Sequence, residues 1–316
     1  MGEEGHRTLP LTTQLPAEGT LGFPLTAFPI PRDTRTVTGW RGRYLAGILV
    51  LCFMLAATAG SATAACLVGG PNGVCFPFPD LDFRMTARVS PQSLPTGKPA
   101  PVAFRIGGRV RHVDGTQPSA LREAILTVDK DVDVSIEGLP LCNDREPRFP
   151  IRRPDELRRL EKRCRNAIVG RGRVGISIAF PGQEPLSLSN RVALLNAGTR
   201  DGTILLYALT EIRVPVPQLL AATIEIRRGP ARGWTVRAKI PAIAGGSGAI
   251  THFALNVGKR FRYRGKRKSF LSASCPDGVF RIMTPKLLFK NEARIPGVAA
   301  QTVLKGSLAV PCKPKG

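Results

Sequence analysis

Residues 203–240 read TILLYALTEIRVPVPQLLAATIEIRRGPARGWTVRAKI, and this stretch identifies the fold class of the chain. Apolar and polar side chains alternate in three segments, 203–211, 220–228 and 233–240, with Pro or Gly residues between them. A period of two places successive side chains on opposite faces of a β-strand, whereas Pro and Gly interrupt strands and favour turns. The stretch therefore predicts three consecutive β-strands.

The same period of two continues along most of the chain after Pro77. Turn signals such as Asp114-Gly115 and Asp277-Gly278 separate the segments. Further strands are predicted at 83–89, 102–110, 123–128, 131–137, 172–180, 186–195, 250–263, 269–275, 279–289 and 300–311. So many short strands indicate an all-β fold over residues 81–316, an antiparallel β-sandwich of about 12 strands or a flattened barrel.

One short helix is predicted as an insertion in the β pattern, at 154–166. It opens with a proline and two acidic residues, which suit the N-terminus of a helix. Leu157, Leu160 and Cys164 recur at helical spacing and predict a buried stripe. The insertion makes 138–168 a candidate sub-boundary within the β domain.

An export signal precedes the β-rich part. Residues 41–65, RGRYLAGILVLCFMLAATAGSATAA, place positive charges, an uncharged apolar run and small residues in the order of a signal peptide. The apolar run is shorter than the ~20 residues that cross a membrane. We expect a signal peptide at 37–65, with 1–36 either not part of the native protein or disordered, and a linker at 66–80. An uncleaved signal that anchors the β domain outside the membrane is the alternative.

Six cysteines follow the expected signal, an even number that favours a disulfide framework in an oxidising compartment. The stripe of the predicted helix points Cys164 towards the body of the domain, where Cys142 can reach it. Lipoprotein processing is an alternative use of Cys66. The chain lacks a CxxC motif and has three histidines, so no metal site is expected. The expected disulfides are Cys142 with Cys164, Cys275 with Cys312, and Cys66 with Cys75.

The chain is strongly basic, with 46 Lys and Arg, 23 Asp and Glu, and a formal net charge of +23. Arginine outnumbers lysine, a bias that a GC-rich genome also produces, so charge alone does not establish a function. An exported basic protein first meets the anionic polymers and lipid headgroups of the cell envelope. Aromatic residues make up 6% of the chain, too few for an evident base-stacking platform. Envelope polyanions are therefore the expected partners, and nucleic acid is the weaker alternative.

The strongest basic pattern is HFALNVGKRFRYRGKRK at 252–268. In a single strand, its apolar side chains would share one face and its basic side chains the other, with same-face residues about 6.6–6.8 Å apart. Such a ladder could meet successive phosphates or carboxylates. A solvated edge strand, whose charges prevent pairing with another sheet, is the alternative interpretation. The candidate polyanion-binding residues are Arg260, Arg262, Arg264, Lys266, Arg267 and Lys268.

Two other charged groups are weaker candidates. Basic side chains at 158–165 lie on the exposed side of the predicted helix, where interleaved acids favour a solvated face. A set of carboxylates with strand-like spacing lacks the glycine and glutamate that an EF-hand needs at its sixth and twelfth positions. These carboxylates leave open a looser calcium site or a surface complementary to the basic ladder. They are Asp129, Asp131, Asp133 and Glu137.

Signals for catalysis are weak. No GxSxG, HExxH or glycine-rich phosphate loop occurs in the chain. His112 and His252 follow the expected signal, and Asp114 stands close to the first in a predicted turn. We expect neither an enzyme nor a cofactor. The alternative is a secreted hydrolase with one of these histidines as the base, which needs a pocket joining it to a carboxylate and a hydroxyl.

Three strings carry a family resemblance: GLPLC at 138–142, CRNAIVGRGRV at 164–174 and SASCPDGVF at 272–280, with a closing Cys312. They resemble an uncharacterised family of exported, β-rich, cysteine-stapled proteins of high-GC actinobacteria, over roughly residues 95–316. The resemblance implies secretion and a β fold, and it brings no activity or residue roles. We expect a secreted or cell-wall-associated β-sandwich that binds anionic envelope polymers or has a structural role.

Overall fold

The computed structural model describes residues 73–77, 80–142, 155–180, 182–213, 217–229 and 233–316. They form an all-β fold with one short α-helix, α2 (Glu156–Arg163), and one 3-10 turn, η2 (Ala244–Gly246), which confirms the predicted fold class. No described helix is long and apolar enough to cross a membrane. The strands are β1 (Gly73–Pro77), β2 (Leu81–Ser90), β3 (Ser93–Pro95), β4 (Ala100–Pro101), β5 (Ala103–His112), β6 (Ala120–Val128), β7 (Val132–Val134), β8 (Ile168–Ile178), β9 (Leu186–Arg200), β10 (Thr203–Ile212), β11 (Gln218–Arg228), β12 (Trp234–Lys239), β13 (Gly248–Val257), β14 (Arg260–Tyr263), β15 (Lys266–Ser269), β16 (Leu271–Ala273), β17 (Val279–Lys290), β18 (Gln301–Pro311) and β19 (Lys313–Lys315).

Twelve of these strands form one antiparallel sheet in the order β1-β2-β5-β13-β8-β9-β10-β11-β12-β6-β17-β18. Hairpins join β8 to β9, β10, β11 and β12 in sequence order, whereas β5 with β13 and β6 with β17 pair segments far apart in the chain. Three small sheets, β14-β15, β4-β16-β7 and the parallel pair β19-β3, lie beside it.

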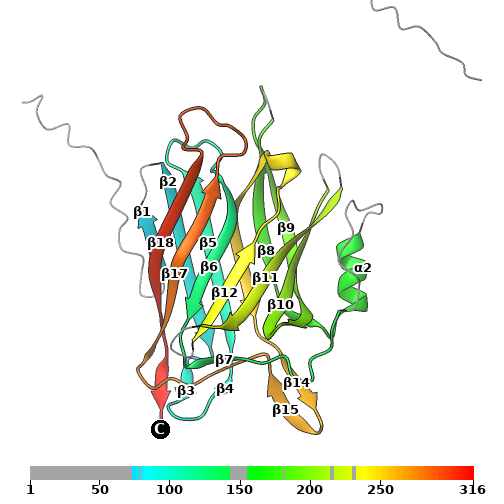
Figure 1. The fold of residues 1–316 in the computed structure, drawn as a ribbon, viewed down its shortest axis with the longest axis vertical. Coiled ribbons are helices and arrows are strands. Elements are labelled where there is room, and N and C mark those ends of the chain that lie inside the picture. The colour runs from blue at the N-terminus through cyan, green and yellow to red at the C-terminus, as the bar shows by residue number, and fades with distance from the viewer. Residues whose placement is uncertain (1–72, 78–79, 143–154, 181, 214–216, 230–232) are drawn as a thin grey trace, which may run out of the picture. The chain divides into compact units, whose positions relative to one another are not determined.

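The large sheet folds over so that its two halves pack face to face (Figure 1). Strands β1, β2, β5, β13, β8 and β9 form one half, and β10, β11, β12, β6, β17 and β18 form the other. Edge-to-face aromatic pairs join the halves, with ring centroids 6.0 Å apart for Phe83 and Phe289 and 5.9 Å apart for Phe104 and Phe280. The core therefore lies between the halves, as in a sandwich.

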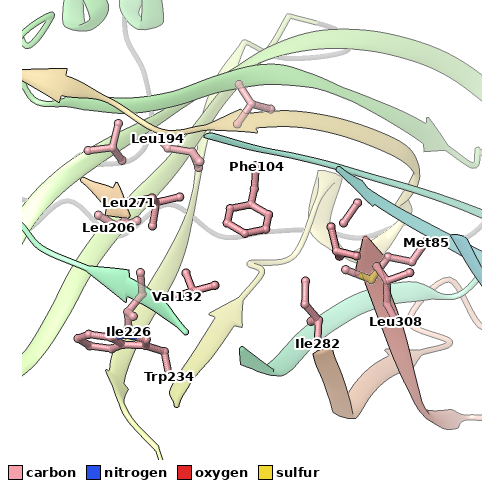
Figure 2. Packing of buried hydrophobic residues seen from close by; sticks show 14 of the residues in the cluster. Met85, Phe104, Val132, Leu194, Leu206, Ile226, Trp234, Leu271, Ile282 and Leu308 are labelled. Atoms are coloured by element: carbon pink, nitrogen blue, oxygen red, sulfur yellow. The ribbon is translucent and has the colours of Figure 1, made fainter. Parts of the chain in front are cut away.

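Sequence period and burial agree along the strands. In β2 every second residue is buried and apolar, and the residues between them face outwards. Figure 2 shows inward side chains of the first half, such as Met85 and Phe104, gathered with Ile226, Trp234 and Ile282 of the second. Burial of such alternating apolar side chains, each worth about 1.5–3 kcal/mol when complete, stabilises the face-to-face arrangement.

Helix α2 packs on the outer face of the sheet, against apolar side chains of β9 and β10. Leu157, Leu160 and Cys164 are all buried there, which confirms the predicted stripe. The helix starts at Glu156 and ends at Arg163, a shorter span than predicted because the last residues of the prediction form a turn.

A residue of a neighbouring strand binds the backbone N–H groups at the start of this helix. Asp155 takes the N-cap position without a capping side-chain hydrogen bond of its own. The buried carboxylate of Glu211 on β10 instead accepts hydrogen bonds from the backbone N–H groups of Asp155 (3.2 Å) and Leu157 (3.3 Å). A carboxylate at a helix N-terminus is favoured by the unpaired N–H groups and the helix dipole. The contact therefore fixes α2 on the sheet.

Two of the expected disulfides are present, Cys142–Cys164 and Cys275–Cys312. The first attaches the C-terminal end of α2 to the segment that follows β7. The second attaches the residue after β18 to the segment that follows β16. The expected pair that involves Cys66 lies outside the described residues.

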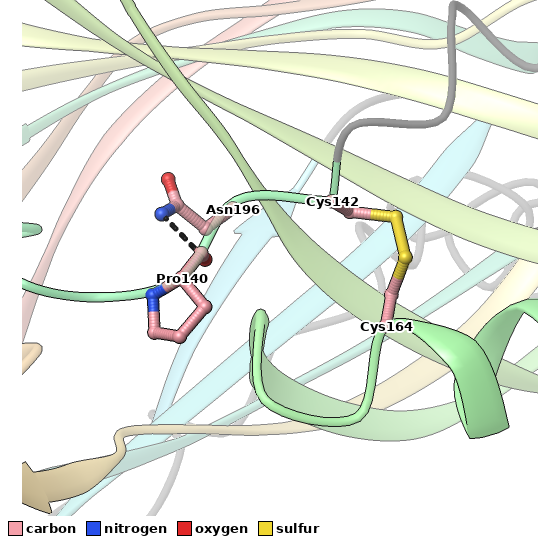
Figure 3. The surroundings of a disulfide bond; sticks show 4 residues. All are labelled: Pro140, Cys142, Cys164 and Asn196. Atoms are coloured by element: carbon pink, nitrogen blue, oxygen red, sulfur yellow. Dashed lines mark hydrogen bonds between the residues drawn. A yellow bond between two sulfur atoms is a disulfide. The ribbon is translucent and has the colours of Figure 1, made fainter.

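Buried Asn196 holds the segment that leads to the first disulfide (Figure 3). Its side-chain amide donates to the carbonyl oxygens of Leu139 (3.3 Å) and Pro140 (3.1 Å), and its side-chain oxygen accepts from the N–H of Gly198 (3.1 Å). Its main-chain oxygen accepts from the N–H of Cys142 (3.1 Å). One side chain of β9 therefore positions a stretch that has no strand partner of its own.

The predicted strand 250–263 is two strands. Gly258 ends β13 with a φ of 151°, and a Cβ atom there would lie 2.8 Å from Cα of Ala103. Because the backbone turns away at this glycine, residues 260–263 leave the large sheet and form β14, which pairs with β15.

The structure describes only part of the N-terminal region for which the sequence made predictions. Within the expected linker 66–80, residues of β1 pair antiparallel with β2, so this stretch contributes a strand to the large sheet. The expected signal at 37–65 and residues 1–36 lie outside the described part of the chain.

Candidate functional site

The predicted basic ladder forms the β14-β15 hairpin. Arg262 lies opposite Arg267 and Tyr263 opposite Lys266, so the hairpin divides its cations between two faces. Five of the six candidate residues are exposed: Arg260, Arg262, Arg264, Lys266 and Arg267.

The sixth candidate residue, Lys268, is half-buried and donates to Glu137 at 3.0 Å. Of the carboxylates considered as a surface complementary to the basic ladder, Glu137 therefore contacts it. Arg260 contacts the backbone oxygen of Pro101 (3.3 Å), and the guanidinium of Arg264 lies 5.1 Å from the ring centroid of Tyr263.

The strand register creates a larger basic surface on the first half of the sheet. Arg88 on β2 lies directly opposite Arg105 on β5. Asn256 on β13 is opposite Arg105 on one side and Arg171 on the other. We call the outward side of β2, β5, β8 and β9 that carries these cations the arginine face. Its arginines are Arg84, Arg88, Arg105, Arg109, Arg111, Arg171, Arg173 and Arg191.

The arginine face is hollowed at its centre. A depression of about 470 Å³ is lined by side chains of four neighbouring strands. Thr86, Gly107 and Ala254 occupy one row across the sheet, and their small side chains leave a low floor. The longer side chains of the next row, which include Arg88 and Arg105, stand at its edge. The depression therefore presents guanidinium groups around an accessible floor.

Only part of this charge is neutralised within the protein. Asp82 pairs with Arg111 (2.8 Å) and Arg84 (3.3 Å). Glu161 of α2 approaches Arg191 (2.9 Å) and Arg171 (3.7 Å).

In the described part of the chain, Arg88, Arg105 and Arg109 have no acidic partner. Like charges directly opposite each other, as in Arg88 and Arg105, are unfavourable on a sheet unless a counter-charge binds.

Lys259 adds a further cation beside the face. Its ammonium group donates to the backbone oxygens of Asn166 (2.5 Å) and Arg165 (3.4 Å). Burial, and then the neighbouring charge of Arg171, lower the pKa of Lys259 from its usual value. The positive potential of the arginine face therefore extends to the start of β14.

Sequence reasoning missed the arginine face because its residues come from four strands. The local signal is an arginine at alternate positions of one strand, as in Arg109 and Arg111 or Arg171 and Arg173. Each pair alone indicates only a solvated strand face. The register of β2, β5, β13 and β8 is needed to bring the pairs together.

The weaker acidic candidates do not form a common carboxylate face. Asp133 pairs with Arg228 (2.8 Å), and Glu137 pairs with Lys268. Asp129 accepts from backbone N–H groups, while burial and the charge of Asp129 raise the pKa of Asp131. No group of three or more metal-ligating side chains occurs in the described residues.

Among the described residues, neither His112 nor His252 has the contacts of a hydrolase triad. Nδ1 of buried His112 lies 2.5 Å from Oδ1 of Asp114 and 3.2 Å from the hydroxyl of Thr116. Both oxygens meet the same ring nitrogen, whereas a triad places the carboxylate and the nucleophile on opposite nitrogens. His252 is exposed, and its Nδ1 lies 3.3 Å from the hydroxyl of Thr251. The His112 contacts close a turn.

A second hollow, of about 320 Å³, lies between the halves of the sheet and is lined almost entirely by apolar side chains. Protein interiors are normally close-packed, and a hollow of this volume lies within the range of ligand pockets. It is therefore a second candidate binding site.

Comparison of the chain with protein-family models, with curated proteins and with solved structures finds no match.

Proposed function

We propose that this chain is an exported, disulfide-stabilised β protein that binds anionic polymers of the cell envelope through its arginine face. The observation that carries the proposal is a group of arginines without an acidic partner in the described residues: Arg88 and Arg105 at the central depression, and Arg109 on the same face. The expected signal at 37–65 and the two disulfides support export.

The spacing of the cations suits a repeating anion. Neighbouring strands lie about 4.8 Å apart, and alternate residues on one strand lie about 6.7 Å apart. The face thus offers a two-dimensional array of guanidinium groups, each able to make paired hydrogen bonds to a phosphate or a carboxylate. A flexible polyanion can meet several of them at once.

The β14-β15 hairpin has a supporting role in this proposal. Its exposed cations, including Arg262 and Arg267, raise the positive potential next to the arginine face. Such charges increase the rate of encounter with a polyanion more than its residence time.

Retention on immobilised polyphosphate and on an immobilised carboxylate polymer tests the proposal with three variants of equal charge loss. The face variant carries Gln at Arg88, Arg105 and Arg109. These positions break no acidic pair in the described residues, so the fold should be unaffected.

The hairpin variant carries Gln at Arg262, Arg264 and Arg267. The control variant carries Gln at Arg281, Lys290 and Lys305, exposed cations on β17 and β18. All variants therefore lose three positive charges.

The face variant should elute at the lowest salt concentration. On polyphosphate, the slope of log affinity against log salt should fall by up to about three, since each lost phosphate contact removes roughly one. The control variant should retain nearly the wild-type slope. Equal losses in face and control variants would reduce the effect to net charge, and would refute the assignment of the arginine face.

A further inference from the structure

The hollow between the sheet halves is apolar along its length. Its lining includes successive inward residues of β11 from Leu220 to Ile226, and residues from Trp234 on β12 to Ile240 just after this strand. Six residues of strand span about 20 Å, and the lining also crosses several strands of both halves, so the space is long and broad. Inward residues such as Ile224 and Val236 are only half-buried, although both belong to the core of the sandwich.

Four inward alanines account for the space. Ala208 and Ala222 lie directly opposite each other on β10 and β11, as Ala238 and Ala124 do on β12 and β6. All four line the hollow, where most of the other inward residues of these strands are Leu, Ile or Val. The second half of the sheet therefore lacks the bulk that would fill the core.

Water is a poor occupant of this hollow. A buried water needs two to four polar partners. The lining carries a hydroxyl on Thr210 and an indole N–H on Trp234, and the remaining side chains are apolar. These two residues lie near opposite ends of β11, so they cannot hold the same water.

The two polar groups of the lining do not face the open space. Oγ1 of Thr210 and Nε1 of Trp234 are buried and have no hydrogen-bond partner among the described residues. Because both atoms are closed off even from a water-sized molecule, the wall that an occupant meets is apolar.

Trp234 lies at one end of the hollow. In Figure 2 it lies beside Ile226 and Val132, which also line the hollow. The guanidinium of Arg228 lies 4.0 Å from the ring centroid and pairs with Asp133. The indole ring is therefore close enough to an occupant of the hollow to report its binding by fluorescence.

We propose that the hollow binds one long aliphatic chain, of the fatty-acyl class. The volume of about 320 Å³ lies within the range of ligand pockets, and an apolar lining without an accessible polar group suits a hydrocarbon chain. This site is inside the sandwich and does not depend on the arginine face.

A fluorescent polyene fatty acid tests the proposal on the purified full chain, because energy transfer from tryptophan reports its position. The chain holds two tryptophans, so a Trp40→Phe background leaves Trp234 as the donor. We expect saturable binding of one probe per chain, displaced by palmitate. Trp234→Phe in this background should remove the energy transfer.

Two further comparisons identify the binding site and the source of the bound aliphatic chain. Ala222→Leu and Ala238→Leu fill the hollow and should each weaken probe binding about tenfold or more. Ala309→Leu adds the same atoms at an exposed position of β18 and should leave binding unchanged. Phospholipid vesicles with a polyene acyl chain show whether the protein also takes the chain from a bilayer.

Binding from either source that the filling variants abolish supports the proposal. The absence of saturable binding from both sources would overturn it. Equal binding by the filling variants and Ala309→Leu would overturn it as well. If filling raises the melting temperature of a protein that binds no probe, the hollow is only a packing defect.

Discussion

Asn196 is a single residue on which a whole segment depends. Its amide holds two carbonyl oxygens of the stretch before Cys142, and the residue is fully buried. Asn196→Ala leaves these groups unpaired and should lower the free energy of unfolding by about 2–3 kcal/mol. Urea denaturation measures this change. Thr199→Ala, at an exposed position of the same strand, is the control, and an equal loss in both would contradict this role.

Asp114 should titrate far below its ordinary range. Hydrogen bonds from the side chain and backbone of Thr116, and from His112, lower the pKa of Asp114 from 3.8 to about 2. Because the folded pKa is the lower one, the carboxylate stabilises the fold above about pH 4, and this contribution is lost as pH falls through about 2. Carboxyl NMR titration measures the pKa. Thr116→Val should raise it, and a wild-type value near 3.8 would contradict the described contacts.

At the residue scale, the sequence identified the disulfide cysteines, because disulfide formation depends on the residue type itself. Helical spacing directed Cys164 towards Cys142, and an even number of cysteines after the expected signal favoured disulfides in general. Both Cys142–Cys164 and the other preferred pair, Cys275–Cys312, are present. The role of Asn196 could not be predicted, because the sequence around an asparagine in a strand does not show which distant carbonyl groups its side chain binds.

The attachment of α2 depends on one disulfide at its C-terminal end. This disulfide joins two cysteines 22 residues apart in sequence, and in the chain-entropy model its loss destabilises the fold by about 3 kcal/mol. A variant with Cys142→Ser and Cys164→Ser should therefore lose about that much stability. Amide hydrogens of Leu160 and its neighbours should exchange faster than those of β2. Hydrogen exchange measured by mass spectrometry follows both.

The second disulfide supplies the control for this prediction. Cys275→Ser with Cys312→Ser removes a link with a separation of 37 residues, at a similar entropic cost. This disulfide is attached to the end of β18 and not to α2. The amide hydrogens of α2 should therefore keep their protection from exchange relative to those of β2. Selective loss of α2 protection in this variant, or none in the first, would contradict the attachment of α2 through Cys142.

At the scale of elements, strand existence was predictable and strand ends were less so. Period two located most strands of the large sheet. It could not detect the change of direction at Gly258, because alternation continues in residues 260–263 after the backbone has left the sheet. The start of α2 depends on Glu211, a residue of β10 that local sequence does not connect with the helix.

At the scale of the whole molecule, the all-β class followed from many short alternating segments, whereas the sheet order did not. β6 pairs with β12 and β17, and β13 with β5 and β8, all distant in sequence. Both proposed sites depend on that order. The arginine face needs β13 between Arg105 and Arg171, and the hollow needs Ala238 beside Ala124.

The most direct test of the central claim is to express the protein in its native cells and to measure its elution from their envelope as salt rises. Wild type and the variant with Gln at Arg88, Arg105 and Arg109 are compared with the charge-matched variant at Arg281, Lys290 and Lys305. We predict that wild type and the charge-matched variant remain on the envelope at low salt and elute as salt rises. The face variant should be released first. Wild-type protein free in the medium at low salt, or joint elution of all three proteins, would contradict the claim.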